Sequence, residues 1–256
     1  MPPYDRYHNG LNKAIRGGTQ MLMMKPFIWS LVRVEVHGIE HFDILPTDQT
    51  FILVANHCSH LDAPLLFGGL PPRLSSRMAT GAAADYFFKH WYTAGPISLV
   101  FNAFPVERAS EQAETVTERQ RHGLAGRLLT EGIPLLIFPE GTRSRAGAMA
   151  PFKPGSAALA ISHVVPIVPA AIVGAHDAWP AGTQRWKSGR PPIHIVFGVP
   201  MYPHPGELAS QFSARVQDAV LLMHDTTAAA YGMPTQDELR ARGEVVKREK
   251  AKREKG

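Results

Sequence analysis

Short apolar runs, each leading into a polar motif, recur along much of the chain. Three of them read TFILVA (50–55), ISLVFNAFPVER (97–108) and IPLLIFPE (133–140). Uninterrupted apolar runs of this kind are typical of strands that are buried on both faces of a sheet. A fourth run, VVPIVPAAIVG (164–174), follows the small side chains of FKPGSAALAIS (152–162). This order predicts a tightly packed helix followed by a fourth strand.

Polar-rich segments with a spacing near 3.6 residues predict the helices of the same fold. Residues 109–132 are typical of a surface helix that ends at Gly132. The apolar run 191–202 predicts a further strand at the sheet edge, and residues 211–232 predict an amphipathic helix that packs on it. Strands that alternate with helices indicate an α/β fold. We predict a single layered domain with a mixed, mostly buried sheet flanked by helices.

The chain divides into three parts by pattern. Residues 1–36 are expected to form an amphipathic segment in contact with a membrane, residues 37–235 the α/β domain, and residues 236–256 a basic tail. The apolar stretch 21–32 has an internal Lys-Pro and falls well short of the roughly 20 residues that span a bilayer. Residues 154–176 lack Lys, Arg, Asp and Glu, but internal prolines argue against one continuous helix. We therefore expect no membrane span, and no secretory signal.

Composition and charge narrow the class of protein. Of 256 residues, 45% are hydrophobic and 19% are charged, which is typical of a folded core, and the single cysteine excludes an internal disulfide framework. The net charge of +5 lies entirely in residues 240–256, which hold eight Lys and Arg against three Glu. The rest of the chain is neutral, so a nucleic-acid-binding domain is not expected. The tail is either a solvated end or a segment attracted to anionic lipid headgroups.

The motif NHCSHLD (56–62) follows the first apolar run and carries candidate chemistry. Pro64 is tolerated in the first turn of a helix, which predicts a helix start near Asp62 and leaves His57 on the preceding loop. The His57 ring can then fold back onto the Asp62 carboxylate, which fixes its tautomer. The other ring nitrogen is left to accept a proton from a substrate hydroxyl. We predict a catalytic base formed by His57 and Asp62.

Other interpretations fit the same motif. Cys58 could be a nucleophile paired with His57, although adjacent side chains tend to point apart. His57, His60 and Asp62 could bind a metal, although they lack a recognisable full ligand pattern. The motif could also be a capped helix start, with Ser59 or Asp62 as the cap and His57 merely hydrogen-bonded.

Two further strand-end motifs carry positive charge. FPEGTRSR (138–145) places a glycine that permits close backbone approach, Gly141, before Arg143. Arg108 ends the second apolar run, and Lys153 follows the third motif. Guanidinium groups suit phosphate because they donate two parallel hydrogen bonds. Together these loops predict an anion site beside the base.

The three motifs together resemble the glycerolipid acyltransferase family, typified by 1-acylglycerol-3-phosphate acyltransferases. The family's N-H-x-S-x-x-D block is matched by residues 56–62, and its F-P-E-G-T-R-S block by residues 138–144. Its second block ends in an arginine, as do residues 104–108, although Val106-Glu107 stands where family members often have Ile-Asp. Its proline-spaced strand is similar to residues 165–169. The resemblance covers residues 37–200 and implies a glycerol-3-phosphate acyltransferase-like fold.

The resemblance implies a reaction and a set of partners. His57 would deprotonate the hydroxyl of lysophosphatidic acid as it attacks an acyl thioester, and Asp62 would orient His57. The residues that would bind the acceptor are Arg108, Glu140, Gly141, Thr142, Arg143 and Lys153. Acyl-CoA or acyl carrier protein would be the donor and co-substrate, with no metal and no cofactor. The protein would act peripherally at the cytoplasmic, inner face of the cell membrane.

Competing functions differ in acceptor or in class. The acceptor could be another lysophospholipid or a glycolipid. Water could replace it in an acyl-thioester hydrolase, although no G-x-S-x-G motif for a serine nucleophile is present. A non-catalytic membrane-binding module is disfavoured by the intact His57 and Asp62 pair.

Overall fold

A computed structural model of the chain describes residues 9–47, 49–83, 101–106, 123–183 and 186–253. In this part of the chain, seven strands form one sheet in the order β1-β7-β6-β2-β5-β3-β4. The strands are β1 (Arg33–His37), β2 (Ile52–Ala55), β3 (Ala79–Ala83), β4 (Phe104–Val106), β5 (Leu135–Ile137), β6 (Ile167–Val173) and β7 (Pro192–Phe197). β6 and β7 are antiparallel, and the other neighbouring pairs are parallel. The prediction of a mixed sheet is confirmed.

The central strands are buried on both faces, as their uninterrupted apolar sequences predict. Alternate residues of a strand point to opposite faces. In β2, Leu53 and Ala55 pack into one hydrophobic cluster, while Ile52 and Val54 pack into another on the opposite face. Every residue of β2 and β6 is buried.

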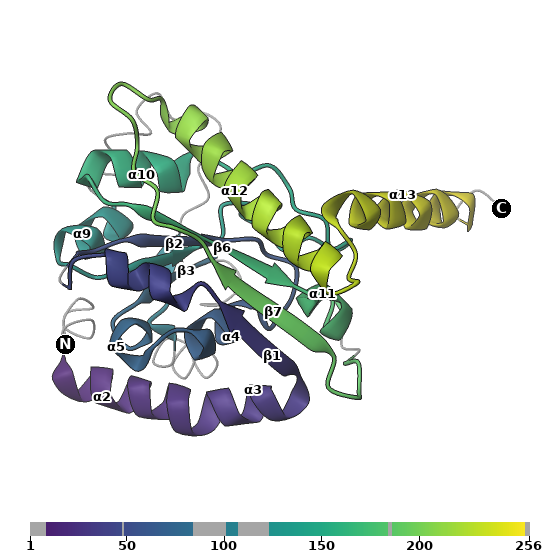
Figure 1. Cartoon of the computed structure of the whole chain (residues 1–256), viewed down its shortest axis with the longest axis horizontal. Coiled ribbons are helices and arrows are strands. Elements are labelled where there is room, and N and C mark those ends of the chain that lie inside the picture. Colours follow the sequence, from purple (N-terminus) through teal and green to yellow (C-terminus); the bar gives the residue numbers. More distant parts are fainter. Residues whose placement is uncertain (1–8, 48, 84–100, 107–122, 184–185, 254–256) are drawn as a thin grey trace.

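Helices cover both faces of the sheet (Figure 1). The helical elements are α2 (Gly10–Thr19), η1 (Gln20–Met24), α3 (Lys25–Leu31), η2 (Ile39–Ile44), α4 (Asp62–Gly69), α5 (Pro72–Ser75), α9 (Leu124–Thr130), α10 (Gly155–His163), α11 (Ala175–Ala178), α12 (Ala209–Ala230) and α13 (Gln236–Arg253). Side chains of α3 and α4 pack into the cluster that contains Leu53. Side chains of α9, α10 and α12 pack into the cluster that contains Ile52. The result is a helix–sheet–helix sandwich.

Several predicted elements lie where the pattern placed them. Residues 154–176 form α10 and then β6, and the predicted helix at 211–232 is α12. The predicted helix at 109–132 is seen only as α9, because residues 107–122 lie outside the described part of the chain. The second apolar run contains β4, but Phe101 is helical and residues 97–100 are not described.

The predicted position of the 191–202 strand at the sheet edge is wrong. β7 lies inside the sheet between β6 and β1, and β1 forms the edge. β1 reads RVEVH, and its mixture of charged and apolar side chains does not resemble the apolar runs of the buried strands. An edge strand is exposed along one side, so it does not need an uninterrupted apolar sequence. The boundary predicted at residue 36 therefore falls inside a strand of the sheet.

The N-terminal helices lie along one side of the domain (Figure 1). α2, η1 and α3 follow one another without a break from Gly10 to Leu31. α3 approaches α4 closely, because a Cβ atom on Gly68 would lie only 2.6 Å from the Trp29 ring. Within the described residues, no helix is both long and apolar enough to cross a membrane.

The basic tail belongs to a helix that projects away from the sheet (Figure 1). α13 is fixed at its beginning, where the Gln236 side chain accepts a hydrogen bond from the Met149 N–H at 2.6 Å. Leu239 is also buried. The tail is thus joined to the domain by its first turn.

Candidate active site

The first motif begins with an asparagine that fixes the loop after β2 to the neighbouring strand β6. The Asn56 side chain accepts a hydrogen bond from the Ile172 N–H at 2.8 Å and donates one to the Ile172 carbonyl at 3.0 Å. Both groups are buried, and a buried polar group left unpaired costs about 1–3 kcal/mol. Asn56 therefore sets the position from which His57 leaves the sheet.

The Asp62 carboxylate organises the rest of the loop. One of its oxygens, Oδ2, accepts hydrogen bonds from the backbone N–H groups of Cys58 at 2.7 Å and Ser59 at 2.8 Å. The same oxygen lies 2.8 Å from Nδ1 of His57. Asp62 is fully buried at the first position of α4. No side chain caps α4 by a hydrogen bond, so the capped-helix interpretation does not hold. The Asp62 carboxylate instead stabilises the preceding turn and holds the ring.

The His57 ring is held through one nitrogen, and its side chain is partly exposed. A carboxylate only accepts hydrogen bonds, so Nδ1 carries the proton and Nε2 presents a lone pair. The ring stacks on Phe138, with centroids 4.0 Å apart and planes 17° from parallel. The side chain remains 22% exposed. This arrangement can accept a proton from a hydroxyl group that approaches Nε2.

The third motif binds the backbone of the first. Glu140 Oε1 accepts a hydrogen bond from the His57 N–H at 2.6 Å, and Oε2 accepts one from the Ala150 N–H at 2.8 Å. The Ser144 N–H donates to the His57 carbonyl at 2.8 Å. These contacts form because β2 and β5 are parallel neighbours whose carboxyl ends meet at one edge of the sheet. Burial raises the pKa of Glu140 to about 7, with the two N–H groups acting in the opposite direction.

Arg143 of the third motif contacts His60 of the first. Its Nη1 atom makes a close hydrogen bond to Nδ1 of His60, and the His60 ring lies 5.2 Å from that of Trp179. Burial, and then the charge of Arg143, lower the pKa of His60, so a neutral ring accepts the hydrogen bond. Sequence reasoning considered His60 only as a metal ligand and missed its contact with Arg143. The two residues are 83 positions apart, so no local pattern could have revealed the pair.

The remaining predicted binding residues lie at the surface of the third motif or outside the described residues. Gly141 and Thr142 are exposed, and Gly141 has a φ of +74° that favours glycine. The exposed side chain of Lys153 lies against Gly141, since a Cβ atom there would be 3.1 Å from Nζ. Arg108 lies outside the described residues.

The structure weakens two other interpretations of the first motif. Cys58 is buried, and burial, followed by the charges of Asp62 and Glu140, raises the pKa of its thiol. Such a thiol is a poor nucleophile, because the thiolate is the reactive form. His57, His60 and Asp62 do not converge as metal ligands, since the two rings turn their Nδ1 atoms toward different partners.

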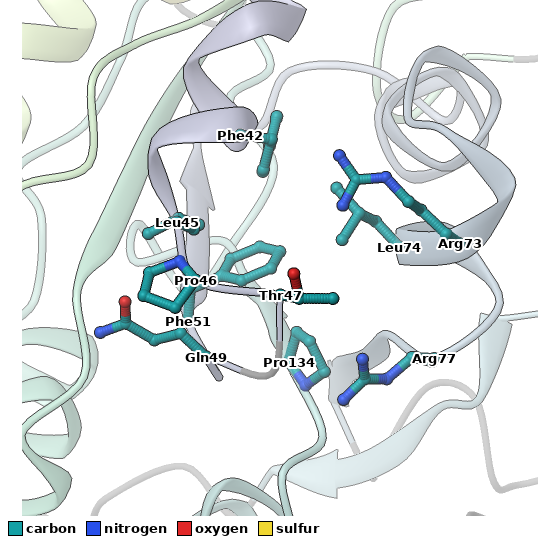
Figure 2. Close-up of a pocket in the computed structure, with 10 residues that line it drawn as sticks. All are labelled: Phe42, Leu45, Pro46, Thr47, Gln49, Phe51, Arg73, Leu74, Arg77 and Pro134. Carbon is teal, nitrogen blue, oxygen red and sulfur yellow. The ribbon is translucent and has the colours of Figure 1, made fainter.

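A small pocket lies near the amino ends of β2 and β5 (Figure 2). Phe51 and Pro134, which line it, directly precede β2 and β5, whereas the first and third motifs follow these strands. Its two arginines are already engaged, Arg73 with Asp43 at 3.0 Å and Arg77 with the Gly132 carbonyl at 3.1 Å. This pocket is separate from the candidate active site.

Comparison with known proteins identifies the family of the chain. A family model described as Acyltransferase matches residues 33–173, which include both the first and the third motif. The chain belongs to the acyltransferase family. The resemblance seen in the sequence is thereby confirmed.

Individual relatives agree with this family. The chain is 32% identical over 181 residues to the 1-acyl-sn-glycerol-3-phosphate acyltransferases alpha of Bos taurus and Homo sapiens, covering 66% of this chain and 55% and 56% of theirs. The 1-acyl-sn-glycerol-3-phosphate acyltransferase of Limnanthes douglasii is 29% identical over 196 residues, or 76% of this chain and 62% of that one. The chain therefore spans little more than half the length of these relatives.

A solved structure has the same fold as this chain. The crystal structure of the 1-acyl-sn-glycerophosphate (LPA) acyltransferase PlsC from Thermotoga maritima superimposes with a TM-score of 0.62. It is 25% identical in sequence, and the match covers 82% of this chain and 78% of that one.

The burial of Glu140 predicts a pH dependence of stability. Its pKa is about 7 in the folded chain and near 4.5 when exposed, so between these values the folded state binds the proton more tightly. Stability from this group is therefore present at low pH and is lost as the pH rises through about 7, by about 3 kcal/mol in total. We expect the unfolding free energy of the wild type, relative to Glu140→Gln, to fall between pH 4.5 and pH 8 in urea denaturation. A difference that stays constant over this range would contradict the assignment.

Proposed function

We propose that this acyltransferase moves a fatty acyl group from acyl-CoA or acyl carrier protein to the free hydroxyl of lysophosphatidic acid, which gives phosphatidic acid. The observation that carries the proposal is the 2.8 Å contact between Nδ1 of His57 and the buried Asp62 carboxylate, with the His57 side chain partly exposed. The relatives are named for acylation of 1-acyl-sn-glycerol-3-phosphate, which supports the choice of acceptor.

The reaction uses His57 as a general base. Nε2 takes the proton of the acceptor hydroxyl as its oxygen attacks the thioester carbonyl carbon. The carbon–sulfur bond then breaks, and the departing thiolate recovers the proton from the imidazolium. Asp62 holds the ring in the productive tautomer and stabilises its positive charge. The thioester is already an activated acyl group, so the proposed reaction requires no metal and no cofactor.

The third motif binds the phosphate of the acceptor. Arg143 donates paired hydrogen bonds, and His60 fixes the plane of its guanidinium group. Lys153 and Arg108 add positive charge, and the exposed Gly141 and Thr142 form the surface of the loop. Glu140 accepts a hydrogen bond from the His57 N–H, so it positions the base instead of contacting the phosphate.

The same contacts restrict how the thioester oxygen is stabilised. Negative charge develops on this oxygen in the transition state, and backbone N–H groups are the usual donors to it. The N–H groups of Cys58 and Ser59 already donate to Asp62, and that of His57 donates to Glu140. The donors to the oxygen are therefore not these three N–H groups.

The first prediction of the proposal concerns the base. We expect His57→Ala to lower the rate of thiol release from acyl-CoA in the presence of lysophosphatidic acid by about 100-fold or more, because a positioned base contributes at least that factor. His163→Ala is the control, since this histidine ends α10 and its Nδ1 bonds to the Leu159 carbonyl within its own helix. Near-normal turnover by His57→Ala would refute the mechanism.

The same assay separates the competing functions. Release that needs both the acceptor and His57 supports acyl transfer. Release that is independent of any acceptor indicates a thioester hydrolase. Release that responds to another lysophospholipid or to a glycolipid, but not to lysophosphatidic acid, keeps the reaction and changes the acceptor. Acyl carrier protein thioesters are tested in parallel as donors.

The second prediction concerns Arg143. We expect Arg143→Ala to raise the KM for lysophosphatidic acid by about 10-fold or more, the scale of a lost charge-assisted hydrogen bond, with little change in the KM for the thioester. Arg145→Ala, which removes an exposed arginine two residues away, controls for the loss of net charge. Equal effects of Arg143→Ala on both substrates would contradict its role in binding phosphate.

We also propose that the N-terminal helices contact the inner face of the cell membrane as a peripheral surface. Leu22 is 79% exposed and Phe27 is 63% exposed, and Leu11 and Met23 are also mostly exposed. Apolar side chains on a surface helix favour insertion into the interface between lipid headgroups and acyl chains. Lys13 and Lys25 lie on the same helices and add attraction to anionic lipids.

The membrane contact predicts a specific loss of vesicle binding. We expect Leu22→Gln with Phe27→Gln to weaken sedimentation with anionic vesicles by about 10-fold or more, because each buried apolar side chain contributes about 1.5–3 kcal/mol when fully transferred. Leu222→Gln is the matched control, because Leu222 is 69% exposed on α12, which covers the other face of the sheet. If removal of residues 246–256 abolishes binding and the double substitution does not, the basic tail is the contact.

A further inference from the structure

Two histidines and a glutamate from separate parts of the sequence meet at the edge of the sheet. Glu35 and His37 are two residues apart on β1, so their side chains point to the same face. His194 lies on β7 directly opposite Glu35 in the parallel register. This face is the one that α12 covers, and Tyr231, just past the end of α12, stacks on the His194 ring.

Two of the three distances between the donor atoms match those around a tetrahedral metal ion. Nε2 of His37 lies 3.3 Å from Nδ1 of His194, which lies 3.6 Å from Oε2 of Glu35. All three atoms lie within 4.8 Å of one another. Zinc binds nitrogen and carboxylate oxygen at about 2.0–2.2 Å, which places two ligand atoms of a tetrahedron about 3.3–3.6 Å apart. A zinc ion therefore fits the cluster with small adjustments of the Glu35 side chain.

The hydrogen-bonding capacity of the cluster also favours a cation. A neutral histidine carries one N–H and one lone pair, and a carboxylate offers lone pairs only. Nδ1 of His194 faces both His37 and Glu35, and whichever ring donates the hydrogen bond between the two histidines, Nδ1 has no proton left for the Glu35 carboxylate. A metal ion accepts a lone pair from all three atoms at once.

The His194 ring is held in a fixed orientation. The side chain is 1% exposed, and the Tyr231 ring stacks on it at 3.8 Å between centroids. The His37 ring also stacks on that of His194, with the centroids 5.6 Å apart. Fixed ligands reduce the entropy cost of binding a metal. Glu35 is partly exposed, which leaves a path for the ion and for a water molecule.

We propose that Glu35, His37 and His194 form a zinc-binding site with a structural role, in which water takes the fourth position. The site is separate from the candidate active site, because β6 and β7 lie between β1 and β2 in the sheet. β1 follows directly on α3, so a metal bound there fastens the strand that carries the N-terminal helices to β7. Within the described residues, these three form a ligand group that lies outside the sequence motifs.

The test is direct zinc binding by the complete, tag-free chain after treatment with a chelator. We expect saturable binding of one zinc ion in competition with a chromophoric chelator. Glu35→Gln and His37→Gln should each raise the Kd by about 100-fold or more, since loss of an outer partner of a ligand already costs about 10–100-fold. Both positions are partly exposed, so these variants avoid disturbing the buried His194. Circular dichroism confirms that each variant is folded.

Two control variants distinguish this site from the other histidines. His57→Ala and His60→Ala remove the histidines of the first motif and should bind zinc as the wild type does. Zinc should also raise the Tm of the wild type and leave that of His37→Gln unchanged. The absence of saturable binding, or equal binding by wild type, Glu35→Gln and His37→Gln, would overturn the proposal.

Discussion

The candidate active site depends on one buried carboxylate. Asp62 is fully buried, and its Oδ2 atom accepts hydrogen bonds from two backbone N–H groups and from the His57 ring. A charged group is costly to bury unless hydrogen bonds compensate it, so the loop must close around this atom. The same requirement explains why His57 and Asp62 are five positions apart. The loop needs enough length to turn back while the aspartate begins α4.

A second buried carboxylate connects the two halves of the site. Glu140 bonds to the backbone of His57 across the parallel pair β2 and β5, so the position of the base depends on the third motif. Its raised pKa shows that burial outweighs the two hydrogen bonds that it accepts. The protein thus gives up some stability near neutral pH to hold the base rigidly. This exchange is common at functional sites, where local requirements override the most stable choice.

The ends of β2 and β5 and the N-terminal helices have different roles in our proposals. The edge formed by the ends of β2 and β5 holds the base and the cations, and the N-terminal helices present apolar side chains for a lipid surface. A lipid acceptor has a charged head and an apolar tail, so both features serve one substrate. β1 links these parts, since it joins α3 to the sheet. The proposed zinc ion at Glu35, His37 and His194 would stabilise this link.

Much of the fold and part of the candidate active site are encoded in local sequence and could be predicted from it. The buried strands β2, β5 and β6, the helix start at Asp62 and the return of His57 to its carboxylate follow from apolar runs, a proline and short spacing. The tertiary structure alone decided which distant residues meet. It brought Glu140 into contact with the backbone of His57, 83 residues away. It also brought Arg143 to His60, and His194 to the position opposite Glu35. It also placed β7 inside the sheet, between β6 and β1. Local sequence sets the conformation of a segment, whereas the partners of its side chains depend on the register and order of strands, which only the packed sheet fixes.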